Sequence, residues 1–425
     1  MERLLIERKI VMFDVHTVRK NFPSLKQTQD GRQVVFFDNP GGTQVPGTVV
    51  EAMNHYLLHD NANHGGAYGT SSRSDAMIEE AHRAMADMLG AASADEIVFG
   101  PNMTSLTFTL SRALAHWLKP GDDVVVTRLD HDANISPWML LARDRGANLR
   151  WVDFRTEDCT LDMDDLERQL SRQTKIVACA YASNAVGTIN DVKTITEMVH
   201  HAGAMIFIDA VQYAPHGLID VQAMDCDFLV CSAYKFFGPH QGVLYGKFDL
   251  LDRLPAYKVR PAKDRPPYKF ETGTQNHEGI AGTLAAVDYL ASLSGSADPE
   301  LSRRERLSAA MKWNEEYGRV LVSRLINGLQ HVTGLHIYGI KDPDRFGKRV
   351  PTVAFRIDGL SPRQVAEYLG DKGIFVWDGN YYALAVTERL GFEDKGGMVR
   401  VGLVHYNTEE EVDRLLEELN RLTSS

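Results

Sequence analysis

The chain has 425 residues, 44% of them hydrophobic and 24% charged, a length and a composition that predict a globular protein of two domains. Its net charge is −11 and its basic residues are scattered, so we expect a small-molecule substrate and neither nucleic acid nor a membrane as partner. No apolar run approaches the ~20 residues of a membrane span, and residues 1–11 lack the apolar stretch of a signal peptide. We therefore expect a cytoplasmic protein, with residues 1–11 as a dispensable extension before a second start at Met12.

The cysteines show neither a CxxC pair nor a zinc-like spacing with histidine, and three of them lie in apolar runs. This pattern predicts buried, reduced thiols and no metal site. The four residues are Cys159, Cys179, Cys226 and Cys231.

From about residue 95 to residue 247, short apolar runs alternate with turns and helical patterns. This alternation is typical of crossover units and predicts an α/β domain with one large, mainly parallel sheet of seven strands. The expected strands are residues 96–100, 122–127, 148–154, 174–183, 205–211, 228–235 and 242–247. The expected helices between them are residues 105–117, 136–145, 163–169 and 192–202, the last of which ends at Gly203.

A surface loop rich in proline is expected at residues 254–268, and a smaller α+β domain follows it. Helical sequence occupies residues 279–329, and a charged helix ends the chain at residues 409–422. The strands expected between them are residues 335–340, 352–357, 374–376 and 399–405. The domains we expect are an N-terminal segment packed with the small domain (1–35), a large domain (36–280) and a small C-terminal domain (281–425).

Polar residues cluster at the carboxyl ends of five predicted strands, where an open parallel sheet binds its ligand. Asp209 and Lys235 follow apolar runs and would lie at the rim of a buried sheet, where an unpaired charge is unfavourable. A structural ion pair would explain these two charges but not the polar residues at the other strand ends. Pyridoxal phosphate (PLP) explains more, because it needs a lysine amine for its aldehyde and a carboxylate to keep its ring nitrogen protonated.

Thr104 and Ser105 open a predicted helix after a strand, where backbone N–H groups and hydroxyls can bind a phosphate. On their own they would be an ordinary helix cap, and His131 on its own would be a solvated loop histidine. Beside a cofactor, His131 could stack on an aromatic ring. Dinucleotide binding is disfavoured, because no G-x-G-x-x-G follows the first strand and no Walker lysine motif occurs.

The chain contains five distinct motifs in a fixed order. They are residues 37–42, Asp209-x-x-Gln212, Ser232-x-Tyr234-Lys235 with residues 236–239, residues 271–276 and residues 400–408. Together they resemble the class V aminotransferase family of fold-type I PLP enzymes, and within it the cysteine-desulfurase-like proteins. The resemblance spans nearly the whole chain. It implies the fold-type I PLP-dependent transferase fold, PLP as the cofactor, and a homodimer with shared active sites.

By position, the resemblance implies that Lys235 forms the Schiff base with PLP and that His131 stacks on the ring, both as catalytic residues. Asp209 would contact the ring nitrogen, and Asn184 would sit near the ring hydroxyl and face the substrate. Arg400 would grip the substrate carboxylate, a task suited to a bidentate fork. The other cofactor-binding residues implied are Gln212 near the ring hydroxyl, Thr104, Ser105, Ser232 and Tyr234 at the phosphate, and Thr274 from the neighbouring subunit.

The chain departs from the desulfurase pattern at two places. Tyr234 stands where desulfurases usually have a histidine, and it can donate to phosphate but cannot carry a proton in the same pH range. Desulfurases of this kind also place a nucleophilic cysteine on a loop of the small domain, whereas the matching residues 377–383 contain none. A protein persulfide therefore has no obvious carrier.

We expect a PLP enzyme of lyase type that cleaves the C–S bond of cysteine or of a related amino acid. A transaminase, an epimerase or a decarboxylase of the same fold would use the same residues and differ in its product. A PLP-binding regulator or scaffold whose catalysis has decayed is the alternative from another class. The presence of all the implied catalytic and binding residues favours an enzyme.

Overall fold

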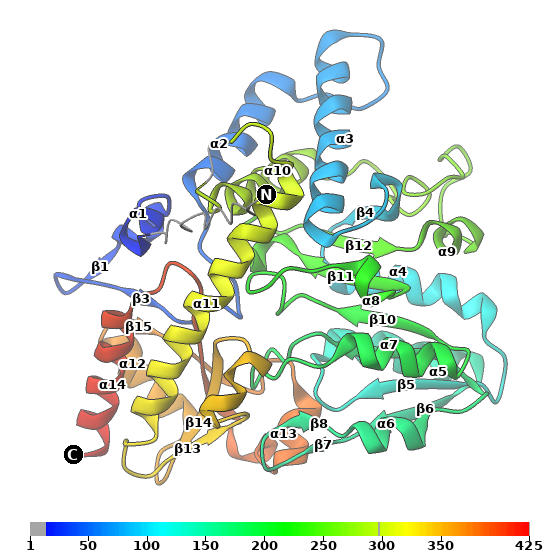
Figure 1. Ribbon diagram of the computed structural model, residues 1–425. Helices are drawn as coiled ribbons and strands as arrows, with labels where there is room; N and C mark the ends of the chain where they lie inside the picture. Colours follow the sequence, from blue (N-terminus) through cyan, green and yellow to red (C-terminus); the bar gives the residue numbers. More distant parts are fainter. Residues whose placement is uncertain (1–13, 296–297, 425) are drawn as a thin grey trace, which may run out of the picture.

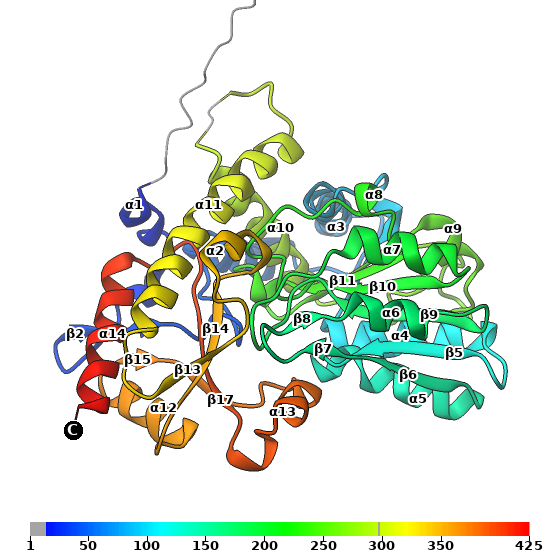
Figure 2. The same ribbon diagram turned by 60° about the horizontal axis from the view of Figure 1, so that its bottom comes forward.

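The computed structural model describes residues 14–295 and 298–424, so the proposed extension at residues 1–11 lies outside the described residues. Figures 1 and 2 show a larger region built on a long sheet and, beside it, a smaller region formed by the C-terminal part of the chain with the N-terminal segment. In the two described ranges, no helix has both the length and the apolarity that crossing a membrane requires.

The larger region contains all seven strands that the sequence predicts, in one sheet. They are β4 (Ile97–Gly100), β5 (Asp123–Thr127), β6 (Asn148–Val152), β9 (Thr174–Ala180), β10 (Met205–Asp209), β11 (Phe228–Ser232) and β12 (Gly242–Gly246). The order is β4-β12-β11-β10-β9-β5-β6; β12 runs antiparallel to both neighbours, and the remaining neighbours pair in parallel. The predicted seven-stranded, mainly parallel sheet is confirmed.

Successive residues of the central strands face opposite sides of this sheet, as the pleat requires. On β10, Ile206 and Ile208 belong to one hydrophobic core and Phe207 to the other. The first core includes α3 (Gly69–Leu89), α7 (Val192–His201) and α10 (His277–Ser292), and the second includes α4 (Met103–Leu114) and α5 (Ser136–Arg145). Because both faces are covered, the strands read as continuous apolar runs in the sequence.

The predicted helices of this region are present, and α5 and α6 (Met163–Gln169) have the predicted bounds. After α7 the chain turns at Gly203, whose φ of 78° suits a glycine past a helix end. Other α-helices are α1 (Val15–Arg19) in the N-terminal segment, α2 (Gly47–His55), α8 (Val221–Met224) and α9 (Phe248–Arg253). Two-stranded pairs are formed by β1 (Thr28–Gln29) with β2 (Arg32–Gln33), also in the N-terminal segment, and by β7 (Phe154–Arg155) with β8 (Thr160–Leu161).

The smaller region contains an antiparallel sheet in the order β13-β14-β17-β16, packed against three helices. Its strands are β13 (Leu335–Tyr338), β14 (Thr352–Ile357), β16 (Trp377–Gly379) and β17 (Met398–Gly402). The helices of its core are α11 (Arg303–Leu329), α12 (Pro362–Asp371) and α14 (Glu409–Thr423), and α13 (Leu384–Leu390) lies between β16 and β17 in the chain.

Three features of this region differ from the expected elements. The helical sequence at residues 279–329 forms two helices, α10 and α11. The run at residues 374–376 forms β15 (Ile374–Phe375), which pairs with β3 (Val35–Phe36) outside the four-stranded sheet. Strand β16 was not predicted, because Trp-Asp-Gly shows no apolar alternation.

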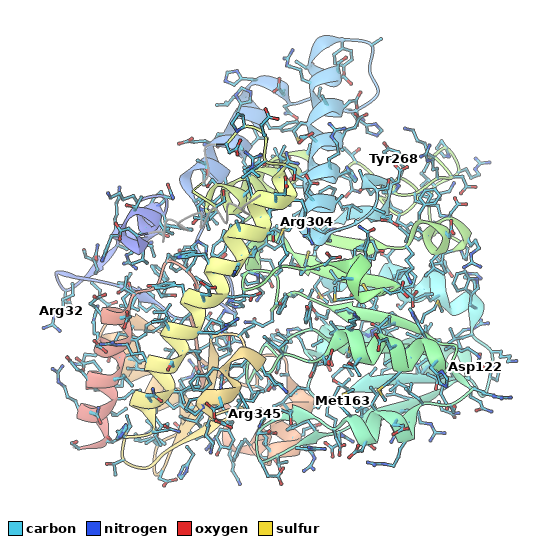
Figure 3. All side chains as sticks on the ribbon, in the orientation of Figure 1. Arg32, Asp122, Met163, Tyr268, Arg304 and Arg345 are labelled. Carbon is cyan, nitrogen blue, oxygen red and sulfur yellow. The ribbon has the colours of Figure 1, made fainter. Side chains whose placement is uncertain are left out.

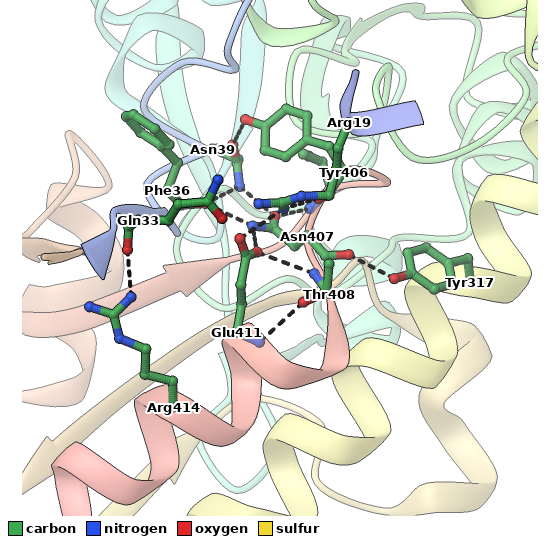
Figure 4. A network of polar contacts seen from close by, with 11 residues as sticks. Arg19, Gln33, Phe36, Asn39, Tyr317, Tyr406, Asn407, Thr408, Glu411 and Arg414 are labelled. Carbon is green, nitrogen blue, oxygen red and sulfur yellow. Dashed lines mark hydrogen bonds and ion pairs between the residues drawn. The ribbon is translucent and has the colours of Figure 1, made fainter. Parts of the chain in front are cut away.

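A polar network joins the N-terminal segment to the start of α14 (Figure 4). Asn39 donates a hydrogen bond to Oδ1 of Asn407 at 3.0 Å, and Arg19 pairs with Glu411 at 2.8 Å. Asn39 and Asn407 are buried, and a satisfied buried network fixes the backbone that carries it. The network therefore holds the turn at residues 38–42 in one position, beside the site described below.

Two arginines, one on α11 and one in the smaller region, contact residues of the larger region (Figure 3). Arg304, near the start of α11, donates to the carbonyl of Ile219 at 2.8 Å. Arg345 pairs with Asp158 at 2.7 Å. These contacts connect the two regions, and the candidate site lies between them.

Candidate active site

A cavity of about 560 Å³ lies at the carboxyl ends of the large sheet's strands and is also lined by residues of the smaller region. It brings most of the predicted site residues together. Those that line it are Thr104, His131, Asn184, Asp209, Gln212, Tyr234, Lys235 and Arg400, whereas Ser105, Ser232 and Thr274 are outside the lining.

Lys235 lies in the short turn that follows β11, with its amine inside the cavity. Its Nζ donates to the carbonyl of Pro40 and lies 4.6 Å from the centre of the Tyr234 ring. Burial, together with the positive charge of Arg400, lowers the pKa of Lys235 from its usual range to about 7. A substantial fraction of this amine is therefore uncharged, and nucleophilic, at neutral pH.

Asp209 is the last residue of β10, and its carboxylate is buried. Oδ1 accepts a hydrogen bond from the backbone N–H of Val211 at 2.9 Å. Burial raises the pKa of Asp209 to about 6, although the positive charge of Lys235 acts to lower it. A cationic N–H group in the cavity would favour the ionised form of this carboxylate.

Asp130 is a second buried carboxyl group whose charge interacts with that of Asp209, and the sequence analysis gave it no role. It accepts hydrogen bonds from the Thr127 hydroxyl and from Nδ2 of Asn134, the latter at 2.6 Å. Burial raises its pKa to about 7, and the charge of Asp209 adds to the rise. Asp130 therefore favours its neutral form when Asp209 is ionised.

His131 presents an uncharged ring to the cavity. Nδ1 accepts from the backbone N–H of Ala133 at 3.0 Å, so the proton of the neutral ring is on Nε2. Burial lowers the pKa of His131 to about 4, and Lys235 and Arg400 contribute. The ring stacks on Tyr382, with 5.6 Å between centres and 17° between planes.

Arg400 on β17 is 3% exposed and is held from several sides. One terminal nitrogen donates to Asp38 at 3.0 Å, the other donates to the carbonyl of Asn184 at 3.1 Å, and the guanidinium lies 4.5 Å from the centre of the Tyr381 ring. Among the described residues its Nε has no hydrogen-bond partner. The guanidinium of Arg400 is thus held in place and still has N–H donors for an anionic ligand.

Three of the residues predicted for the phosphate, Thr104, Ser105 and Ser232, lie at or beside the start of α4, whereas Tyr234 and Thr274 lie elsewhere. Thr104 lines the cavity, while the hydroxyl of Ser232 accepts from the N–H of Met103 at 3.1 Å. The N–H of Ser105 donates to Asn102, the helix cap, at 2.9 Å. The backbone donors here are therefore partly occupied by the protein itself, and the phosphate roles of these residues stay predictions.

Three other predicted residues have distinct surroundings. The amide of Gln212 donates to the hydroxyl of Thr352 at 3.0 Å. The amide nitrogen of Asn184 donates to the carbonyl of Tyr381 at 2.9 Å, and its Oδ1 is buried without a partner in the described part of the chain. Thr274 is exposed and lies outside the cavity of its own chain, and its predicted contact with the cofactor of a neighbouring subunit stays a prediction.

Residues 377–383, where the resemblance predicts the cysteine-bearing loop of desulfurases, form one wall of the cavity through Trp377, Tyr381 and Tyr382. The four cysteines are buried and free, as predicted, and none of these described residues lines the cavity. Burial raises the pKa of each of the four thiols, so they are poor nucleophiles.

The sheet order, with the lysine and the carboxylate at its carboxyl edge, defines an α/β enzyme of the fold-type I PLP-dependent class. The chain belongs to the aminotransferase class-V family, whose model matches residues 35–415. A cysteine desulfurase of Synechococcus elongatus is 33% identical over 97% of this chain, which spans 64% of that protein's length. An aminotransferase-like protein of Gibberella zeae is 34% identical and covers 95% of this chain and 97% of its own length. The solved apo structure of a cysteine desulfurase from Thermococcus onnurineus superposes with a TM-score of 0.86 at 30% identity, covering 96% of this chain and 98% of that one.

Proposed function

We propose that this chain is a PLP-dependent lyase that cleaves the C–S bond of cysteine or of a related amino acid. The observation that carries the proposal is one cavity with three groups: an amine of lowered pKa on Lys235, a buried carboxylate on Asp209 and a fixed guanidinium on Arg400. The names of the relatives, cysteine desulfurases among them, support the same chemistry.

The residues of the cavity fit PLP. Lys235 would bond to the aldehyde, Asp209 would accept from the ring nitrogen, and the flat, uncharged ring of His131 would stack on the cofactor. The unpartnered Oδ1 of Asn184, considered among the described residues, is free to bond to a ring substituent. When bound, PLP supplies an electron sink for negative charge on the α-carbon of an amino acid.

The chain's own residues then bind the substrate and move its proton. Arg400 binds the substrate carboxylate through its remaining donors, and Asp38 and Tyr381 keep the guanidinium in place. Lys235, whose pKa is lowered to about 7, is suited to accept the α-proton and to return a proton near neutral pH.

The surroundings of the cavity favour elimination over sulfur transfer to the protein. Converting cysteine to alanine leaves a sulfur atom that a nucleophile must accept, and no cysteine among the described residues lines the cavity. Elimination needs no acceptor: cysteine and water give sulfide, pyruvate and ammonium, with breakage of the C–S bond and no oxidant. We therefore propose β-elimination.

We further propose a cytoplasmic homodimer, in which Thr274 of one subunit contributes to the site of the other. A transaminase, epimerase or decarboxylase would share Lys235 and Arg400, and a decayed PLP-binding regulator would bind the cofactor without turnover. These alternatives differ in their products.

The test is to load the purified protein with PLP, add cysteine and measure sulfide, pyruvate, alanine, D-cysteine and carbon dioxide in the same samples. We expect sulfide and pyruvate in equal amounts. Alanine as the main product would contradict elimination, and a keto acid that keeps its sulfur would indicate transamination. Absence of any turnover with cysteine and its derivatives would favour the regulator.

The lowered pKa of Lys235 also predicts how cofactor uptake depends on pH. The amine reacts when unprotonated, so with a pKa of about 7 the rate of PLP uptake should rise about tenfold between about pH 6 and about pH 8 and then level off. Stopped-flow absorbance of the PLP band with cofactor-free protein measures this. Because Arg400 lowers this pKa, Arg400→Met should move the rise to higher pH. A rate that is flat over this range would contradict the prediction.

A further inference from the structure

Two aromatic side chains at the cavity have most of their surface in solvent. Trp377 is 53% exposed and Tyr382 is 73% exposed, yet both line the same cavity as Lys235 and Arg400. Large aromatic rings are usually buried, and exposed ones that line a binding cavity are typical of contacts with a ligand.

The loop that carries Tyr382 is held in an unfavourable backbone conformation. Tyr381 and Tyr382 have φ values of 56° and 57°, in the left-handed region that side chains larger than glycine avoid. Such backbone conformations are unfavourable and persist where the surroundings fix them, often at functional sites. Here the carbonyl of Tyr382 accepts from the N–H of Asp132 at 2.6 Å, and that of Tyr381 accepts from Asn184 at 2.9 Å.

The rings of Trp377 and Tyr382 lie beside the groups that would bind the substrate. Trp377 on β16 is the antiparallel partner of Arg400 on β17, so their side chains lie on the same face of the sheet. The ring of Tyr382 is stacked on His131. Further apolar lining comes from Met103, Phe108 and Pro137.

The side chain of cysteine ends in a single sulfur atom, which offers little apolar surface to these two rings. A planar, apolar group attached to the sulfur would extend the substrate and could pack against them, with a gain from buried aromatic area and ring stacking. Such a group also makes the departing thiolate more stable, so it leaves more readily.

Building on the C–S cleavage proposed above, we infer that the preferred substrates are cysteine S-conjugates whose sulfur carries a planar, apolar group, and that Tyr382 and Trp377 select them. For S-phenylcysteine, the C–S bond to the β-carbon breaks, its electron pair leaves on sulfur, and the sulfur takes up a proton. With one water consumed, the products are thiophenol, pyruvate and ammonium, and no oxidant or reductant is needed.

The experiment compares S-phenylcysteine with S-methylcysteine on the PLP-loaded enzyme, by pyruvate formation. We expect kcat/KM to favour S-phenylcysteine by about tenfold or more, the range that a hydrophobic pocket achieves. Tyr382→Gly removes the ring and suits the positive φ, so it should lower this ratio about tenfold. Tyr382→Phe keeps the ring and serves as the matched control, with the ratio retained.

A second measurement separates this inference from the proposed function. Calorimetric titration of PLP-loaded Lys235→Ala protein reports binding without turnover, and S-phenylcysteine should bind more tightly than S-methylcysteine in that protein but not in Lys235→Ala/Tyr382→Gly. Equal binding and equal kcat/KM for the two compounds would overturn the inference, as would a ratio that Tyr382→Gly leaves unchanged. If the binding preference is present but no pyruvate forms from any substrate, the inferred selectivity stands and the proposed lyase reaction fails.

Discussion

Replacing Lys235 by alanine is expected to lower turnover by about a thousandfold or more, because the change removes both the amine that bonds to PLP and the proposed acid–base group. The absorbance band of covalently bound cofactor should disappear in the same variant. The measurement is pyruvate release per mole of protein, with absorbance recorded in the same cuvette. Folding should be preserved, because Lys235 is a buried amine whose removal relieves a desolvation cost.

The matched control for this variant is Lys193→Ala. Lys193 is an exposed residue of α7, on a helix that packs on the sheet, so its loss should change turnover little. Turnover of Lys235→Ala equal to that of the wild type would contradict the central role of this lysine, and so would a covalent cofactor band that survives the substitution.

The large sheet and its carboxyl edge could be predicted from the sequence because both depend on local pattern. Strands covered on both faces give uninterrupted apolar runs, and Asp209 and Lys235 stand out as charges at the ends of such runs. Asn184 and His131 were predicted in the same way, as polar residues that follow strands, and both line the cavity. Their chemical roles stay predictions.

The rest of the cavity depends on contacts between residues far apart in the chain. Asp38 was recognised within a motif but without a role, because its partner Arg400 comes more than three hundred residues later. Strand β16 exists because it pairs with β17, not because of its own sequence. The amide of Gln212 bonds to Thr352 of the smaller region, a contact that no local pattern indicates.

Arg400→Leu is expected to lower kcat/KM for cysteine by about a hundredfold, mainly through KM. A buried, charge-assisted pair with the substrate carboxylate is worth several kcal/mol when one partner is removed, so this loss is of the expected size. Arg400→Lys should recover only part of it, since an ammonium keeps the charge but lacks the planar fork that Asp38 and Tyr381 hold in place. Steady-state kinetics with pyruvate as readout measure all three proteins.

If Arg400 had only a structural role, its loss would lower kcat/KM for all substrates alike. Cysteinamide as substrate distinguishes a structural role from binding of the substrate carboxylate. This substrate lacks the carboxylate, so wild type should use it poorly, and Arg400→Leu should reduce its kcat/KM far less than it reduces that of cysteine. Equal losses for both substrates would mean that the substitution damages the cavity itself, for example by leaving the half-buried Asp38 near Lys235 without its partner. A loss confined to cysteine would identify Arg400 as the group that binds the carboxylate, and would thereby orient the substrate with its α-carbon toward the amine of Lys235.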